Sequence, residues 1–159
     1  AEIGEQIGEE HVERLLRAAR LYYDYILVDL PTEMTPISYT ALEEADRIFY
    51  VMTPDAPSFR IFSRVLDLYA KISVDPTDRL EVLLNRVSRD TELDARDVQQ
   101  HFGFPVAGTF QEDFKRIQQA INRGHPLRKS RRERGLSPFT RDVQKLARTL
   151  LAQQSGRSA

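Results

Sequence analysis

The stretch YYDYILVDLP, residues 22–31, constrains the fold more than any other part of the 159-residue chain. Its centre, residues 26–28, is a short apolar run with β-branched side chains, which is typical of a strand buried on both faces of a parallel sheet. Pro31 would end such a strand, because proline has no N–H to donate to a ladder. We therefore predict a strand over residues 24–30, with Asp29 near its carboxyl end, where open α/β sheets bind their ligands.

An acid at the end of a buried strand can have two roles. Apolar residues followed by Asp, one further residue and Pro resemble the Walker B strand of nucleotide hydrolases. In that strand the Asp holds a magnesium-bound water beside the phosphates. The alternative is an ordinary core strand whose acid caps the following turn, and this segment alone does not decide between the two.

Helical and strand patterns alternate along the rest of the chain. Gly103 is a natural helix C-terminal cap, and Ser137-Pro138 is a favourable helix start. We expect strands over residues 47–53, 79–85 and 105–110, and helices around residues 12–19, 38–45, 57–72, 91 or 94 to 102, 112–122 and 138–151. This alternation predicts an α/β fold whose mostly parallel sheet is covered by helices on both faces.

Composition excludes several classes of protein. The chain contains no cysteine, so disulfides and thiolate metal sites are impossible. Its apolar runs are too short to span a bilayer, and its first residues lack the basic and apolar regions of a signal peptide. We expect a soluble cytoplasmic protein with one domain over residues 1–154 and a flexible tail over residues 155–159.

Charge is unevenly distributed, although the formal net charge is only −1. Residues 1–60 contain twelve acids and five Lys or Arg, whereas residues 115–148 contain eleven Lys or Arg and two acids. The segment RKSRRER, residues 128–134, would attract the phosphates of DNA or anionic lipid headgroups. It lacks aromatic residues that stack on bases, and a solvated loop is the alternative. The candidate anion-binding residues are Arg128, Lys129, Arg131, Arg132 and Arg134.

Four segments, of which the first is the stretch already described, follow one another in order: YDYILVDLP, ALEEADRIFYVMTPDAPSFR, LLNRV and FGFPVAGTFQEDFKRIQQAINRGHPL. Their order and spacing resemble the MinD/ParA family of deviant Walker P-loop ATPases. Within that family the chain most resembles the CpaE/TadZ pilus-assembly and localisation ATPases, which often carry a receiver-like domain upstream. The resemblance covers about residues 9–151, and it implies a P-loop NTPase fold with ATP and magnesium as cofactors.

The resemblance also implies a set of nucleotide-binding residues. Asp29 corresponds to the Walker B acid, which would be catalytic and would hold magnesium through water. The switch loop that senses the γ-phosphate would be Pro31, Thr32 and Glu33. Asn85 and Arg86 match a strand-end motif whose Asn reads the adenine edge, a task suited to an amide that both donates and accepts. The loop that borders the base would be Gln111, Glu112 and Asp113.

The sequence departs from the family pattern in three ways. The Walker A pattern G-x-x-x-x-G-K-[ST] occurs nowhere in the 159 residues. The switch loop PTEMTP has no glycine, and Gln111 replaces the usual proline of the base-bordering loop. We therefore expect the chain to be the C-terminal part of an ATPase domain that lacks the P-loop strand. We expect it not to hydrolyse ATP alone, and we expect its parent to be a weak ATPase.

Three functions are consistent with this sequence. The first is a nucleotide-dependent localisation or assembly factor for a pilus or secretion machinery, acting as a homodimer. The alternatives are a ParA-like partitioning protein that binds DNA non-specifically, and a non-catalytic regulatory scaffold. The tail QQSGRSA is not an amphipathic helix, so we expect no direct membrane anchor. A protein in the bacterial cytoplasm would then reach the inner membrane only through protein partners.

Overall fold

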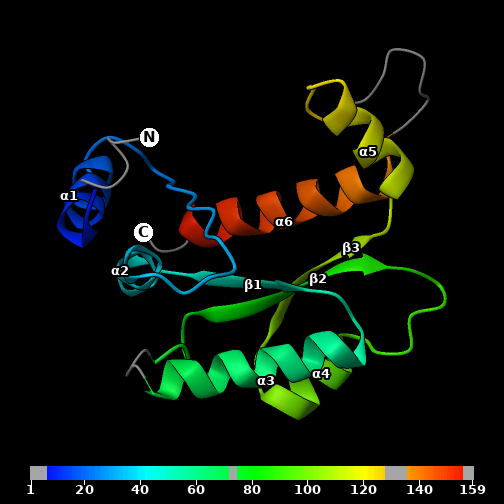
Figure 1. Ribbon diagram of the computed structural model, residues 1–159. Coiled ribbons are helices and arrows are strands. Elements are labelled where there is room, and N and C mark those ends of the chain that lie inside the picture. The colour runs from blue at the N-terminus through cyan, green and yellow to red at the C-terminus, as the bar shows by residue number, and fades with distance from the viewer. Residues whose placement is uncertain (1–6, 72–74, 128–135, 156–159) are drawn as a thin grey trace. The chain divides into compact units, whose positions relative to one another are not determined.

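The computed structural model describes residues 7–71, 75–127 and 136–155 (Figure 1). The chain divides into two compact units, Ala1–Ile48 and Phe49–Ala159. None of the helices within the described ranges is long and apolar enough to cross a membrane.

The first unit contains two helices that pack on each other, α1 (Glu9–Ala19) and α2 (Pro36–Glu44). The end of α1 is linked to the end of α2 by Arg20, which forms an ion pair with Asp46 at 3.0 Å and donates to the Glu44 carbonyl. Thr35 caps α2 by accepting a hydrogen bond from the Ser38 N–H at 3.2 Å. This cap satisfies one of the unpaired N–H groups at the start of the helix.

The strand predicted over residues 24–30 is not formed. Residues 25–31 have no regular secondary structure, and their apolar side chains are exposed, Leu27 to 89%. A strand needs a neighbour that pairs with its backbone groups, and no described residue forms a ladder with this segment. The prediction of a buried strand is therefore wrong, although the apolar run that led to it is present.

The second unit is built on a three-stranded sheet in the order β1-β2-β3. β2 (Leu80–Val87) is central, and it pairs in parallel with β3 (Val106–Gln111). β1 (Ile48–Met52) is the other neighbour of β2. The prediction of an α/β fold with a parallel sheet is confirmed.

Helices cover both faces of this sheet (Figure 1). One face carries α3 (Ala56–Lys71) and α4 (Ala95–Phe102), and the other carries α6 (Pro138–Ser155), while α5 (Phe114–Asn122) follows β3. Three of the predicted helix boundaries are confirmed. Asp94 caps α4 through the Arg96 N–H at 2.6 Å, Gly103 ends α4 with a φ of 78°, and the Ser137 hydroxyl accepts from the Thr140 N–H at 3.1 Å.

An aromatic cluster fills the core between the sheet and α3. Phe62 of α3 is fully buried, and its ring stacks on Tyr50 of β1 with centroids 4.4 Å apart. The rings of Phe102 and Phe104 approach Phe62 edge-on, at 4.8 and 6.0 Å. These geometries are the favourable ones for aromatic pairs, so Phe62 joins α3, α4 and the sheet.

Replacement of Phe62 by alanine tests this core. Phe62→Ala should lower the free energy of unfolding by about 3–5 kcal/mol, because it removes buried area and leaves a cavity. Urea unfolding followed by circular dichroism measures the change. Phe114, whose side chain is 64% exposed, provides the control; Phe114→Ala should change stability by less than about 0.5 kcal/mol. Equal unfolding midpoints for the two variants would contradict the assignment of Phe62 to the core.

Candidate functional site

The carboxyl ends of β2 and β3 lie side by side, because the strands run parallel with Val87 opposite Gln111. The Glu112 N–H donates to the Val87 carbonyl at 3.0 Å, which ties the loop after β3 to the end of β2. The structure thus brings two predicted groups of site residues to one edge of the sheet. These are Asn85 and Arg86 of β2, and Gln111, Glu112 and Asp113 at the end of β3.

Asn85 is half-buried near the end of β2, and its Oδ1 accepts a hydrogen bond from the Arg86 N–H at 2.9 Å. The Nδ2 group of Asn85 has no hydrogen-bond partner among the described residues. Arg86 has a φ of 57°, in the left-handed region that costs a residue with a side chain of order 1–3 kcal/mol. The hydrogen bond from the Arg86 N–H to Asn85 stabilises this irregular point of β2 and uses only the amide oxygen of Asn85.

Asp113 begins α5, and its side chain is only 13% exposed. One oxygen, Oδ1, lies 3.9 Å from the Arg116 Nε, whereas Oδ2 is buried without a hydrogen-bond partner in the described structure. A buried acceptor without a donor is costly, and most such groups in proteins are paired. Asp113 therefore holds a buried, unpaired acceptor at the same edge where the Asn85 Nδ2 has no protein partner among the described residues.

A third group at the end of β1 was not identified from the sequence. The Thr53 hydroxyl donates to the Asp55 carboxylate and lies 2.7 Å from the Ser58 hydroxyl. The other Asp55 oxygen accepts from the Ser58 N–H at 2.8 Å, so Asp55 caps α3. The hydrogen bonds from Thr53 and Ser58 lower the pKa of Asp55. An acid three residues before a serine, at the start of a helical pattern, was the available signal.

The remaining predicted site residues belong to the first unit. Asp29 is exposed in the irregular segment after α1, as are Pro31, Thr32 and Glu33 of the following loop. The carbonyl of Glu33 accepts from the Ser38 hydroxyl at 3.3 Å, which fixes one end of this loop to α2. Nothing in the structure tests a site formed by Asp29 with Asn85, so that assignment stays a prediction. Within the described ranges, no cluster of three metal-binding side chains occurs.

The predicted anion-binding residues cannot be placed. Arg128, Lys129, Arg131, Arg132 and Arg134 all lie outside the described residues.

Comparison with known proteins identifies relatives of the whole chain. A putative septum site-determining protein MinD from Mesostigma viride is 32% identical over 127 residues, which cover 76% of this chain and 43% of that protein. The ParA family ATPase from Chlorobium tepidum TLS is 27% identical, with a TM-score of 0.67 over 78% of this chain and 50% of that one. MinD from Pyrococcus horikoshii OT3, solved with Mg-ADP, has a TM-score of 0.71 at 20% identity, over 95% of this chain and 59% of its own.

The chain has the fold of the MinD/ParA-type P-loop ATPases. No protein-family model matches the sequence. The chain spans less than half the length of the Mesostigma protein and 50–59% of the two solved structures. The resemblance to MinD/ParA proteins is therefore confirmed, whereas the closer likeness to CpaE/TadZ proteins stays a prediction.

The residues at this edge fit one part of a nucleotide better than another. Asn85 carries an amide and Asp113 a carboxylate, groups that can hydrogen-bond the polar edge of a base, although the Asp113 Oδ2 is enclosed in this structure. Phosphates are held by consecutive backbone N–H groups, glycines and lysine, as in a Walker A loop. No such pattern occurs in the sequence. The chain's own residues therefore do not form a phosphate-binding loop, and base binding by Asn85 and the loop of Gln111, Glu112 and Asp113 stays a prediction.

The cap at the start of α3 gives a pH-dependent prediction. Asp55→Ala should lower the free energy of unfolding at pH 7 by about 0.5–2 kcal/mol, because it removes the N-cap. The pKa of Asp55 is lower in the folded protein than its ordinary value of 3.8, so its contribution is complete above that value and is lost as the pH falls through the folded pKa. Urea unfolding at several pH values measures both effects.

Asp78→Asn is the matched control, because Asp78 is an exposed acid in the turn before β2. The free energy of unfolding of Asp78→Asn should equal that of the unchanged chain at every pH. A gap between Asp55→Ala and the unchanged chain that stays the same as the pH is lowered from 7 to the acid-unfolding limit would contradict the prediction.

Proposed function

We propose that this chain is part of a MinD/ParA/CpaE-like ATPase, a nucleotide-dependent localisation or assembly factor that serves a pilus or secretion machinery. The observation that carries the proposal is the edge formed by β2 and β3. There Asn85, whose Nδ2 has no hydrogen-bond partner among the described residues, lies near the end of β2. Asp113, whose Oδ2 is buried without a partner in the described structure, lies two residues beyond the end of β3, and the Glu112–Val87 hydrogen bond ties the two strands. The fold shared with MinD and ParA proteins supports this assignment.

In this proposal different residues contact the base, the magnesium-bound water and the γ-phosphate of the nucleotide. Asn85 and the loop of Gln111, Glu112 and Asp113 bind and orient the base. Asp29 holds the magnesium-bound water, and Pro31, Thr32 and Glu33 respond to the γ-phosphate. Bound Mg-ATP would supply a phosphoryl group whose charge is neutralised by the metal. Phosphate binding falls to a Walker A loop carried by a longer protein, here called the parent, so this chain alone should not hydrolyse ATP. Self-association as a homodimer is part of the same proposal.

Calorimetry with ATP, ADP and magnesium, on this chain and on the parent, tests the proposal. The parent should bind, and the chain alone should give no measurable heat, because it lacks the phosphate-binding groups. In the parent, Asn85→Ala should weaken ATP binding about tenfold, the expected effect of losing one buried hydrogen-bonding partner.

Asn122→Ala provides the control, because Asn122 is an exposed amide at the end of α5. It should leave ATP affinity unchanged. A parent that binds no nucleotide would refute the proposal and favour a non-catalytic scaffold.

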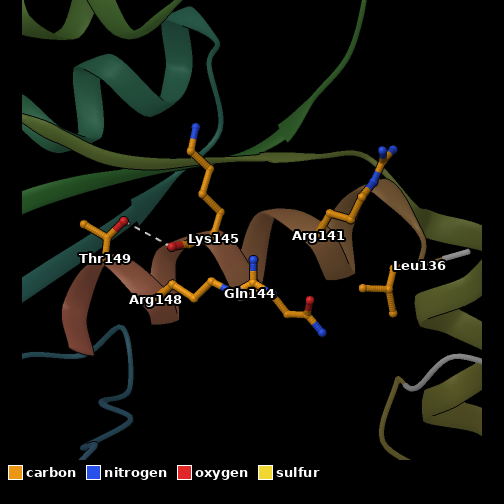
Figure 2. A pocket seen from close by; sticks show the side chains of 6 residues that line it. All are labelled: Leu136, Arg141, Gln144, Lys145, Arg148 and Thr149. Carbon is orange, nitrogen blue, oxygen red and sulfur yellow. Dashed lines mark hydrogen bonds between the residues drawn. The ribbon is translucent and has the colours of Figure 1, made fainter. Parts of the chain in front are cut away.

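One further observation favours the DNA-binding alternative. Figure 2 shows Arg141, Lys145 and Arg148 projecting from α6, around an open hollow of about 450 Å³ that is also lined by Gln144 and Thr149. The three cations are exposed, and none has an ion-pair partner within the described part of the chain. Spacings of four and three residues place them on one side of the helix. The side of α6 that carries Phe139 packs on β3, whereas Val143 and Leu151 of the same helix are exposed.

Fluorescence anisotropy with a short labelled DNA duplex of arbitrary sequence tests this alternative on the chain itself. Three phosphate contacts predict a slope of log affinity against log salt of about −2.7. Substitution of Arg141, Lys145 and Arg148 by Gln should make the slope less steep by about 2.7, the share of those three contacts.

A charge-matched control changes Arg64, Lys71 and Arg96 to Gln, on the helices of the other face of the sheet. This variant should bind the duplex as the unchanged chain does. Equal salt slopes for both triple variants would exclude α6 as a DNA-binding surface.

A further inference from the structure

Gln111 is the last residue of β3, which is an edge strand of the described sheet. A backbone N–H of this strand that points away from β2 needs an acceptor outside the sheet. The Gln111 N–H donates to the Asp142 Oδ2 of α6 at 2.9 Å. The next N–H, that of Glu112, donates to the Val87 carbonyl of β2 at 3.0 Å. Two consecutive N–H groups are therefore held from opposite sides, one by a helix and one by a strand.

The surroundings of Asp142 favour its hydrogen bond to the Gln111 N–H. It is half-buried, and it is the sole acid among the residues of α6. One turn earlier on α6, the Phe139 ring packs against Phe110 of β3 with centroids 5.8 Å apart. A carboxylate that accepts from a backbone N–H makes a stronger hydrogen bond than a neutral acceptor does. The aromatic contact and the charged hydrogen bond together fix α6 to the end of β3.

We infer that Asp142 is a positioning residue, which sets the geometry of the loop that borders the nucleotide base; the inference rests on the proposed function. Asp113, whose buried Oδ2 is unpaired in the described structure, is two residues after Gln111, whose N–H is held by Asp142. Loss of the Asp142 carboxylate frees Gln111 and thereby alters where Asp113 lies relative to Asn85. The base should bind less tightly, whereas binding of the phosphates should be unaffected.

Calorimetry on the parent, with Mg-ATP and with Mg-tripolyphosphate, separates these two effects. Asp142→Ala should weaken ATP binding about tenfold, the effect expected for the loss of one charged hydrogen bond that orders the loop. The affinity for tripolyphosphate, which has no base, should not change. Asp142→Asn retains an oxygen that can accept from Gln111, so its ATP affinity should stay within about threefold of the unchanged parent. If Asp142→Ala does not fold, Asp142→Glu moves the acceptor by one methylene and should show the same selective loss.

The outcomes distinguish this inference from the proposed function. A parent that binds ATP equally well with and without the Asp142 carboxylate overturns the inference and leaves the proposed function standing. Equal losses for ATP and tripolyphosphate also overturn it, because they indicate general destabilisation. A parent that binds neither compound overturns both.

Discussion

The pairing of backbone N–H and C=O groups between neighbouring strands decides which parts of this chain become ordered structure. β2 has a partner on each side, and its apolar side chains are the most deeply buried of the sheet. Residues 25–31 carry an equally strong strand pattern, yet they have no such partner among the described residues and stay irregular. The difference between the two segments therefore lies in the available neighbours and not in their composition.

The same constraint explains how far the sequence could be interpreted. Helix boundaries at Asp94, Gly103 and Ser137 depend on contacts within a few residues, so local patterns predicted them correctly. The strand over residues 24–30 was wrong, because an apolar run shows that side chains need burial but does not show that a neighbouring strand exists. The sheet order places the carboxyl ends of adjacent parallel strands together, so the proximity of the ends of β2 and β3, where Val87 lies opposite Gln111, could be expected from the fold class.

Other parts of the candidate site could not be predicted. The bond from Gln111 to Asp142 joins residues 31 positions apart, and no periodicity or motif connects them. The positive φ of Arg86 could not be predicted from the sequence, because arginine seldom adopts that conformation. The Thr53–Asp55–Ser58 group differs from these, because its capping pattern of an acid three residues before a serine is visible in the sequence. It matches no motif of the family resemblance, which includes Asp29.

Departures from good local structure gather at the edge where β2 and β3 end. Arg86 is held in a left-handed conformation there, and the buried Oδ2 of Asp113 has no donor within the described structure. Each feature costs free energy. Arg86 lies within a register shift of the β2–β3 ladder, between the paired residues Leu84 and Val87, so its left-handed conformation belongs to an irregularity of the strand. Such features persist only where the surroundings hold them, and here the holding contacts come from Asn85, Val87 and Asp142. Departures of this kind are more frequent at functional sites than elsewhere, which is why the proposed nucleotide site is assigned to this edge and not to the regularly capped helix starts at Asp94 and Ser137.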